Sequence, residues 1–131
     1  MTATARLDPG AEDSAVNEVA LGGRVSADPE ERSMPSGDLV VTWRLVVTRP
    51  PTRRRSRVCV DTIDCTAWSS ATRRAALRLH AGDHVQVGGA LRRHFWRGPT
   101  GAASRVDVEV SSVRRMRPRA VEPVDRGPVV A

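Results

Sequence analysis

The sequence is poor in residues that mark several protein classes. Its 131 residues include no lysine, no tyrosine, one phenylalanine, three tryptophans and two cysteines. It contains no run of about 18 apolar residues, which excludes a membrane-spanning helix. Residues 1–15 lack the apolar core of a secretory signal. We therefore expect a cytoplasmic protein.

The two cysteines, Cys59 and Cys65, do not indicate a metal site. They form no CxxC pair, and no histidine stands at ligand spacing from them. We expect neither a metal nor any other cofactor. Two thiols on one strand do not meet easily. Cys65 is interpreted as a small core residue, and in a reducing compartment we do not expect Cys59 to form a bond between subunits.

The charge is strongly basic. The formal net charge is +6, the sequence pI is about 11.2, and all 21 basic residues are arginine. Such a balance makes polyanions the first partners to consider, with a solvated basic surface as the alternative. An enzyme is not expected, because no acid, base and nucleophile converge. Asp61 and Asp64 fall on opposite strand faces, and Glu30 and Glu31 lie in a predicted loop.

Alternating apolar and polar residues predict β-strands, because successive strand side chains point to opposite faces. In LVVTWRLVVT (39–48), for example, the odd positions are apolar and place Trp43 in the core. Five strands are predicted, at residues 16–25, 39–48, 58–68, 83–96 and 105–113. The connections are predicted to be a loop at 28–38, a basic hairpin tip at 49–57 and a turn at 97–104.

One helix is predicted, in SSATRRAALRLHAGD (69–83). Ser69 or Ser70 can cap its start, and Gly82 is expected to end it. Ala71, Ala75 and Leu79 recur at a spacing of four and form the expected buried stripe.

The predicted order is three strands, a helix and two strands. This is an all-β plan, that of a five-stranded OB-fold barrel with one helix between strands 3 and 4. The barrel is expected to occupy residues 15–116. Residues 1–14 and 117–131 are rich in small, polar and proline residues, and we expect them to be disordered.

Two tryptophans fall on the polar side of predicted strands. Trp68 ends DTIDCTAW (61–68) in register with Thr62, Asp64 and Thr66, and Trp96 follows Arg92 and His94 by the same alternation. An outward aromatic can stack on nucleic-acid bases. The alternatives are that these tryptophans cover the barrel end or fill a subunit interface. Phe95 has the opposite parity and is expected to pack.

Four blocks of sequence carry a family resemblance. NEVALGGRV (17–25) looks like N-x-V-x-L-x-G-R-L, and DPEERSMPSG (28–37) looks like DPExRxTPxG, with Met34 in place of threonine. DTIDCTAW matches I-D-C-x-A-W, and GDHVQVGGALR (82–92) resembles G-D-x-V-x-V-x-G-x-L-R. In this order and spacing they resemble the bacterial single-stranded DNA-binding protein family.

The resemblance implies an OB-fold that assembles as a homotetramer. It also implies sequence-independent binding of single-stranded DNA during replication, recombination and repair, without catalysis. Two features depart from the family pattern. Residues 117–131 show neither a Gly/Pro/Gln-rich linker nor an acidic tip, so partner recruitment through such a tip is not expected. Thr62 and Pro51 occupy positions where the family places aromatics.

Basic side chains supply the expected phosphate contacts, which should weaken as salt rises. The candidate DNA-binding residues are Trp68, Trp96, Arg44, Arg53, Arg54, Arg55, Arg57, Arg92, Arg93 and His94. For the hairpin tip the alternative is a solvated charge run. Two other functions stay open, namely an OB-fold assembly subunit with weak DNA affinity and a binder of single-stranded RNA.

Overall fold

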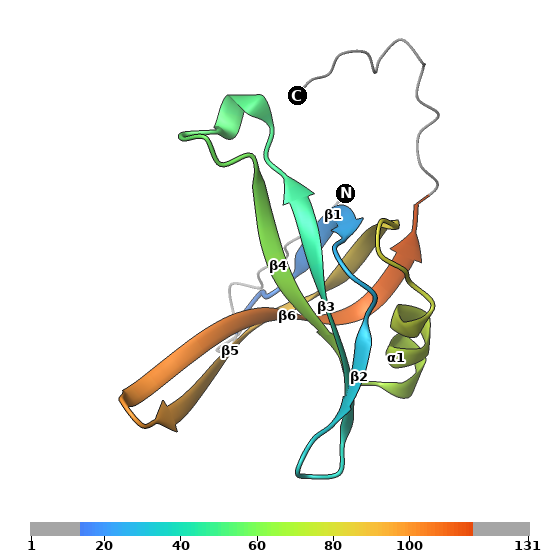
Figure 1. The fold of residues 1–131 in the computed structure, drawn as a ribbon, viewed down its shortest axis with the longest axis vertical. Helices are drawn as coiled ribbons and strands as arrows, with labels where there is room; N and C mark the ends of the chain where they lie inside the picture. The colour runs from blue at the N-terminus through green and yellow to red at the C-terminus, as the bar shows by residue number, and fades with distance from the viewer. Residues whose placement is uncertain (1–13, 117–131) are drawn as a thin grey trace.

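The computed structural model describes residues 14–116, and the predictions for residues 1–13 and 117–131 lie outside this range. This part of the chain folds into six strands, one α-helix and a short 3-10 turn, arranged as in Figure 1. In chain order they are β1 (Val19–Val25), β2 (Glu30–Ser33), β3 (Leu39–Thr48), η1 (Pro51–Arg53), β4 (Val60–Ala67), α1 (Ser70–Leu77), β5 (His84–Gly98) and β6 (Gly101–Arg115).

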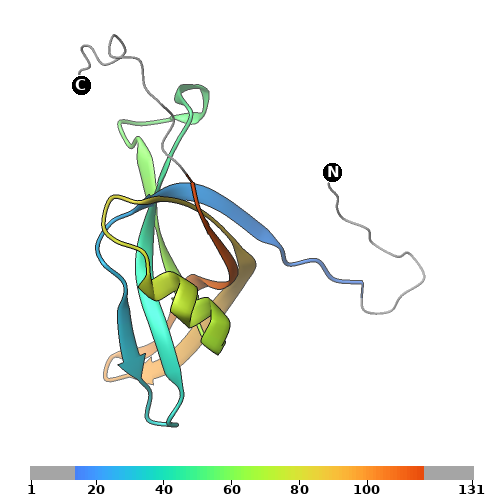
Figure 2. The same cartoon turned by 90° about the vertical axis from the view of Figure 1, so that its right-hand side faces the viewer.

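The strands form one sheet in the order β1-β5-β6-β4-β3-β2, and β1 also pairs with β3, which closes the sheet into a barrel. Among the described strands, β4 and β6 pair in parallel and the other pairs are antiparallel. The predicted all-β barrel is confirmed. Its helix lies between the third and fourth predicted strands, which are β4 and β5. In Figure 2 α1 lies in front of the ring of strands, at one end of the barrel.

The barrel core consists of the apolar sides of the strands, as the alternation predicts. Its largest fully buried side chains are Leu45, Val25, Val41, Val85, Val87, Val108 and Cys65. Trp43 is only 5% exposed and belongs to the same cluster. The core assignments of Trp43 and Cys65 are therefore confirmed.

The helix begins where predicted but buries a different stripe. Ser69 is the N-cap, and its Oγ accepts a hydrogen bond from the backbone N–H of Thr72. Thr72 and Ala76 are the buried helical residues, whereas Ala71 is exposed. The helix ends at Leu77 rather than near Gly82, and Leu79 reaches the core from the following turn. Of the predicted stripe, Leu79 is buried and Ala75 is half-buried, and the prediction is wrong for Ala71.

Two strand predictions are also corrected. Glu30–Ser33, predicted as loop, forms β2, a short edge strand whose four residues are all exposed. Residues 97–104, predicted as a turn, lie mostly in strands, because β5 and β6 stay paired up to Gly98 and Gly101. The two strands therefore form a long hairpin, here called the arm, residues 90–109, whose far part extends away from the barrel (Figure 1).

Within residues 14–116 no helix is long and apolar enough to span a membrane. In the same part of the chain no group of three or more His, Cys, Asp or Glu side chains could hold a metal ion.

Candidate nucleic-acid interface

The polar sides of β3, β4, β5 and β6 form a continuous surface, here called the outward face. Directly opposed residues of paired strands share a face. Arg44 opposes Asp64 across β3 and β4, and Thr66 opposes Glu109 across β4 and β6. Arg92 opposes Asp107 across β5 and β6. Residues from four strands, up to 65 positions apart in the chain, therefore meet on one side of the sheet.

Trp96 lies on the outward face near the tip of the arm. It opposes Ala103 in the β5–β6 ladder, and half of its surface is exposed. His94 precedes it on the same face. The ring of Trp96 is therefore accessible to a ligand that lies along the arm.

Trp68 lies at the other end of the outward face, directly after β4. It is partly buried and lines a cavity of about 430 Å³ together with Ala90, Arg92 and Glu109. The Arg73 Nη1 of α1 donates a hydrogen bond to the backbone carbonyl of Trp68. The Nε of Arg73 lies 3.7 Å from a carboxylate oxygen of Glu31. The junction that carries Trp68 is thus tied to both α1 and β2.

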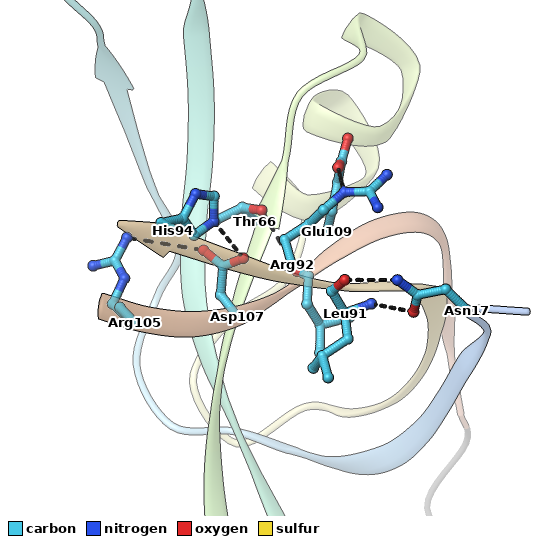
Figure 3. Close-up of polar contacts among 9 residues, drawn as sticks. Asn17, Thr66, Leu91, Arg92, His94, Arg105, Asp107 and Glu109 are labelled. Carbon is cyan, nitrogen blue, oxygen red and sulfur yellow. Dashed lines mark hydrogen bonds and ion pairs between the residues drawn. The ribbon is translucent and has the colours of Figure 1, made fainter. Parts of the chain in front are cut away.

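Two arginines of the outward face are paired with carboxylates. The Nε of Arg44 donates to Asp64 Oδ1 over 3.0 Å, and the Nε of Arg92 donates to Glu109 Oε1 over 2.7 Å. Figure 3 shows the second of these pairs on the arm. Two of the predicted phosphate contacts are therefore already engaged within the chain.

Asp107 is the most buried charged residue of this face, with 2% of its surface exposed. Its Oδ1 lies 3.0 Å from His94 Nε2, and its Oδ2 lies 3.8 Å from Arg105 Nη2 (Figure 3). Asp107 also lines a cavity of about 350 Å³ at the centre of the face, with Arg44, Asp64 and Arg105.

Three acidic residues lie on this face and are absent from the predicted site residues. They are Asp64, Asp107 and Glu109. Their alternation with apolar residues already placed them on the polar sides of their strands. What the sequence did not reveal is which arginine each carboxylate faces, because these pairs join different strands.

The other side of the arm carries Arg93 and Phe95. The prediction that Phe95 packs is wrong, because 70% of its surface is exposed. The Arg93 guanidinium carbon lies 5.0 Å from the centroid of the Phe95 ring, within cation–π distance. Leu91 and Val106 share this side and are about half exposed. Arg93, predicted on or beside the outward face, thus lies opposite Trp96 rather than with it.

Residues 49–57, here called the basic loop, connect β3 to β4 and include η1. Arg53, Arg54, Arg55 and Arg57 are all exposed. Arg54 Nε donates to the carbonyl of Arg49, whose own side chain is held by Asp61. Within residues 14–116 none of the four exposed arginines has a carboxylate within 4.0 Å.

Asn17 fastens the arm to the segment before β1. Its Nδ2 donates to the carbonyl of Leu91, and its Oδ1 accepts from the N–H of Leu91, both over 2.8 Å (Figure 3). This pair of bonds lies next to the cavity that Trp68 lines. Asn17 therefore sets where the arm leaves the barrel relative to Trp68.

Comparisons with known proteins identify relatives of the chain. Residues 16–116 match the model of the Single-strand binding protein family. The chain is 31% identical over 105 residues to Single-stranded DNA-binding protein 2 of Listeria innocua, which covers 79% of this chain and 66% of that protein. It is 31% identical to Single-stranded DNA-binding protein A of Bacillus subtilis, over 79% of this chain and 61% of that protein.

Both alignments therefore span less than two thirds of the relatives' own length. Among solved structures, the Plasmodium falciparum SSB complex with ssDNA superposes with a TM-score of 0.69 at 18% identity. The superposition covers 82% of this chain and all of that one. At this identity the likeness establishes the shared fold.

Proposed function

Because the chain belongs to the single-strand binding protein family, we propose that it binds single-stranded DNA without sequence preference. Bases stack on Trp68 and Trp96, and arginines contact the phosphates. Every base has a π-face, so stacking on an aromatic side chain is tolerant of sequence. Such binding serves replication, recombination and repair, and it requires no catalytic group.

One observation carries the proposal: Trp68 and Trp96 lie on the same outward face of the barrel. Trp96 is half exposed although it is a large apolar residue, and Trp68 borders a cavity beside Arg92. The exposed half of the Trp96 ring adds nothing to the packing of the barrel core. A ligand with flat apolar surfaces accounts for both positions.

Self-association, as a homotetramer in the cytoplasm, is the second part of the proposal. It is supported by the opposite side of the arm, where Leu91, Phe95 and Val106 are 48%, 70% and 46% exposed. Neighbouring exposed apolar side chains are typical of protein contact sites. Native mass spectrometry measures the number of chains, and a monomer at micromolar concentration contradicts this part.

An OB-fold assembly subunit with weak DNA affinity is the second candidate function. The observation that favours it is the pairing of Arg44 with Asp64 and of Arg92 with Glu109, which leaves fewer free cations on the face.

Binding of single-stranded RNA is a further alternative, since RNA and DNA both offer bases and phosphates. Competition between oligo-dT and oligo-U separates DNA binding from RNA binding.

Tryptophan fluorescence during titration with oligo-dT at low and high salt tests the proposal. We expect quenching that weakens with salt, and a loss of about 1–3 kcal/mol in binding free energy for Trp68→Ala and for Trp96→Ala. Leu77→Ala is the control, because it removes an exposed apolar side chain at the end of α1, outside the outward face and the apolar side of the arm. Absence of binding at low salt would contradict DNA binding and leave the assembly subunit.

A further inference from the structure

The arginines of the protein fall into two electrostatic classes. Those on the outward face have a carboxylate within reach, as in the pairs Arg44–Asp64 at 3.0 Å and Arg92–Glu109 at 2.7 Å. Arg105 and His94 share Asp107. In contrast, Arg53, Arg55 and Arg57 of the basic loop have no acidic partner within 4.0 Å among residues 14–116.

A phosphate encounters these two classes differently. At an unpaired arginine it displaces only water and counterions, and the released counterions favour binding. At Arg44 or Arg92 it must replace a carboxylate that already holds the guanidinium, and the displaced carboxylate then repels it at close range. Asp107 cannot turn away into solvent, because it is 2% exposed. The centre of the outward face is therefore unfavourable for phosphates.

The same carboxylates favour the bases of a bound strand. Their exocyclic amino groups and ring N–H groups donate hydrogen bonds, which carboxylates accept. The acidic residues share the outward face with Trp68 and Trp96, where stacked bases would lie. A strand whose bases face the sheet and whose phosphates face away satisfies both groups.

We propose that Asp64, Asp107 and Glu109 determine the path of the bound strand. By neutralising Arg44, Arg92 and Arg105 they exclude phosphates from the outward face, so the bases lie there and the basic loop holds the phosphates. This inference rests on the proposed DNA binding and assigns the arginines of that site to two roles. Arg44 and Arg92 thus position carboxylates rather than contact phosphates.

The dependence of oligo-dT affinity on salt measures the two roles. For single strands, each phosphate contact contributes about 0.7 to the slope of log K against log salt. Replacement of Arg53, Arg55 and Arg57 by alanine should lower the slope by about 2, the sum of three such contacts. Arg44→Ala should leave the slope unchanged. A loss of slope in Arg44→Ala as large as that of a single basic-loop variant overturns the inference.

Asp64→Asn provides the second test, because it releases Arg44. We expect tighter binding and a slope steeper by about 0.7, as Arg44 then gains a phosphate. Asp38→Asn is the matched control: it makes the same charge change at an exposed residue of the β2–β3 turn, where the Asp38 carboxylate accepts a hydrogen bond from the Ser36 hydroxyl. A gain in affinity also cannot arise from a loss of folding.

A double-mutant cycle separates the pair from its surroundings. The gain of Asp64→Asn should disappear in the Arg44→Ala background, because no released guanidinium remains. A gain that persists there, or one equal to that of Asp38→Asn, contradicts the inference. The parent chain is titrated first at low salt. If it does not bind oligo-dT, the proposed function itself fails, whereas binding with equal slopes for all arginine variants rejects only the present inference.

Discussion

The guanidinium of Arg49 donates two hydrogen bonds to the carboxylate of Asp61, from Nε to Oδ2 over 2.9 Å and from Nη2 to Oδ1 over 2.7 Å. The backbone N–H of Arg49 also donates to the carbonyl of Cys59 over 2.7 Å. These contacts join the start of the basic loop to Cys59 and to Asp61 of β4, just beyond its other end. The hydrogen bonds from Arg49 lower the pKa of Asp61 below its usual 3.8, more than desolvation raises it.

The Asp61 carboxylate should therefore stabilise the fold in a pH-dependent way. Because its pKa is lower in the folded chain, its contribution is present above the ordinary pKa and is lost as pH falls through the folded-state value. We expect Asp61→Asn to unfold at slightly lower urea concentration than the parent at pH 7 and at the same concentration near pH 2. Glu18→Gln, at an exposed position without an ion pair in the described residues, is the control. A difference that survives at pH 2 would argue against the linkage.

Two adjacent glycines of β5 should respond unequally to alanine. A Cβ on Gly89 would collide with the carbonyl oxygen of Glu109 and would lie 2.9 Å from the Cα of Val110. A Cβ on Gly88 would lie 2.8 Å from the Oγ of Ser112, which can rotate away, and in ordinary contact with the carbonyl oxygen of Val19 at 3.9 Å. Gly89→Ala should lower the free energy of unfolding by about 1–3 kcal/mol or more. Gly88→Ala should lower the free energy of unfolding by less. Urea denaturation measures both, and equal effects would contradict the close approach of β5 and β6.

The two thiols should differ in reactivity. Burial raises the pKa of Cys65 to about 12, whereas Cys59 is exposed. Because the thiolate is the reactive form, a thiol reagent at pH 8 should modify one cysteine in the native chain and two in guanidinium chloride. Cys59→Ser should then show no rapid native reaction. Two equivalents consumed by the folded parent would contradict the burial of Cys65.

Trp43 and Trp96 should separate stability from binding. Trp43 is 5% exposed and packs in the core, and its indole N–H has no hydrogen-bond partner among residues 14–116. Trp43→Ala should cost about 3–5 kcal/mol of unfolding free energy, and Trp43→Phe less, since it also removes the unpaired donor. Trp96→Ala should leave stability nearly unchanged because the ring is half exposed. A large loss of stability in Trp96→Ala would favour a structural role for that residue.

The outline of the barrel was predictable because alternation is a local property. Val41, Trp43 and Leu45 are buried, as their odd positions predict, and the neighbouring Arg44 is exposed. The same rule places Trp96 on the outward face. The DNA-binding roles of the candidate residues stay predictions that the titrations address.

The elements that the sequence did not predict have no local signal. All four residues of β2 are exposed, so Glu30–Ser33 shows no apolar alternation, and only backbone pairing to β3 makes it a strand. The predicted strands stop short of the tip of the arm because Gly98, Pro99 and Gly101 are typical turn residues. In the structure they form only the tip of the hairpin, with Gly101 at φ +119°. The buried helix stripe depends on how α1 sits across the barrel end, which a spacing of four does not fix.

Alternation along the sequence predicted which side chains share one face of a strand, because it holds without reference to the partner strand. The tertiary structure settled which of these side chains are covered, as the exposed Phe95 shows, and which charges meet. Arg44 and Asp64 are 20 residues apart, and Arg92 and Glu109 are 17 apart. Their contacts depend on the register of neighbouring strands. That register is set by hairpin lengths and by the irregularity between Gly88 and Gly89, where the β5–β6 pairing passes from Ser112 to Val110.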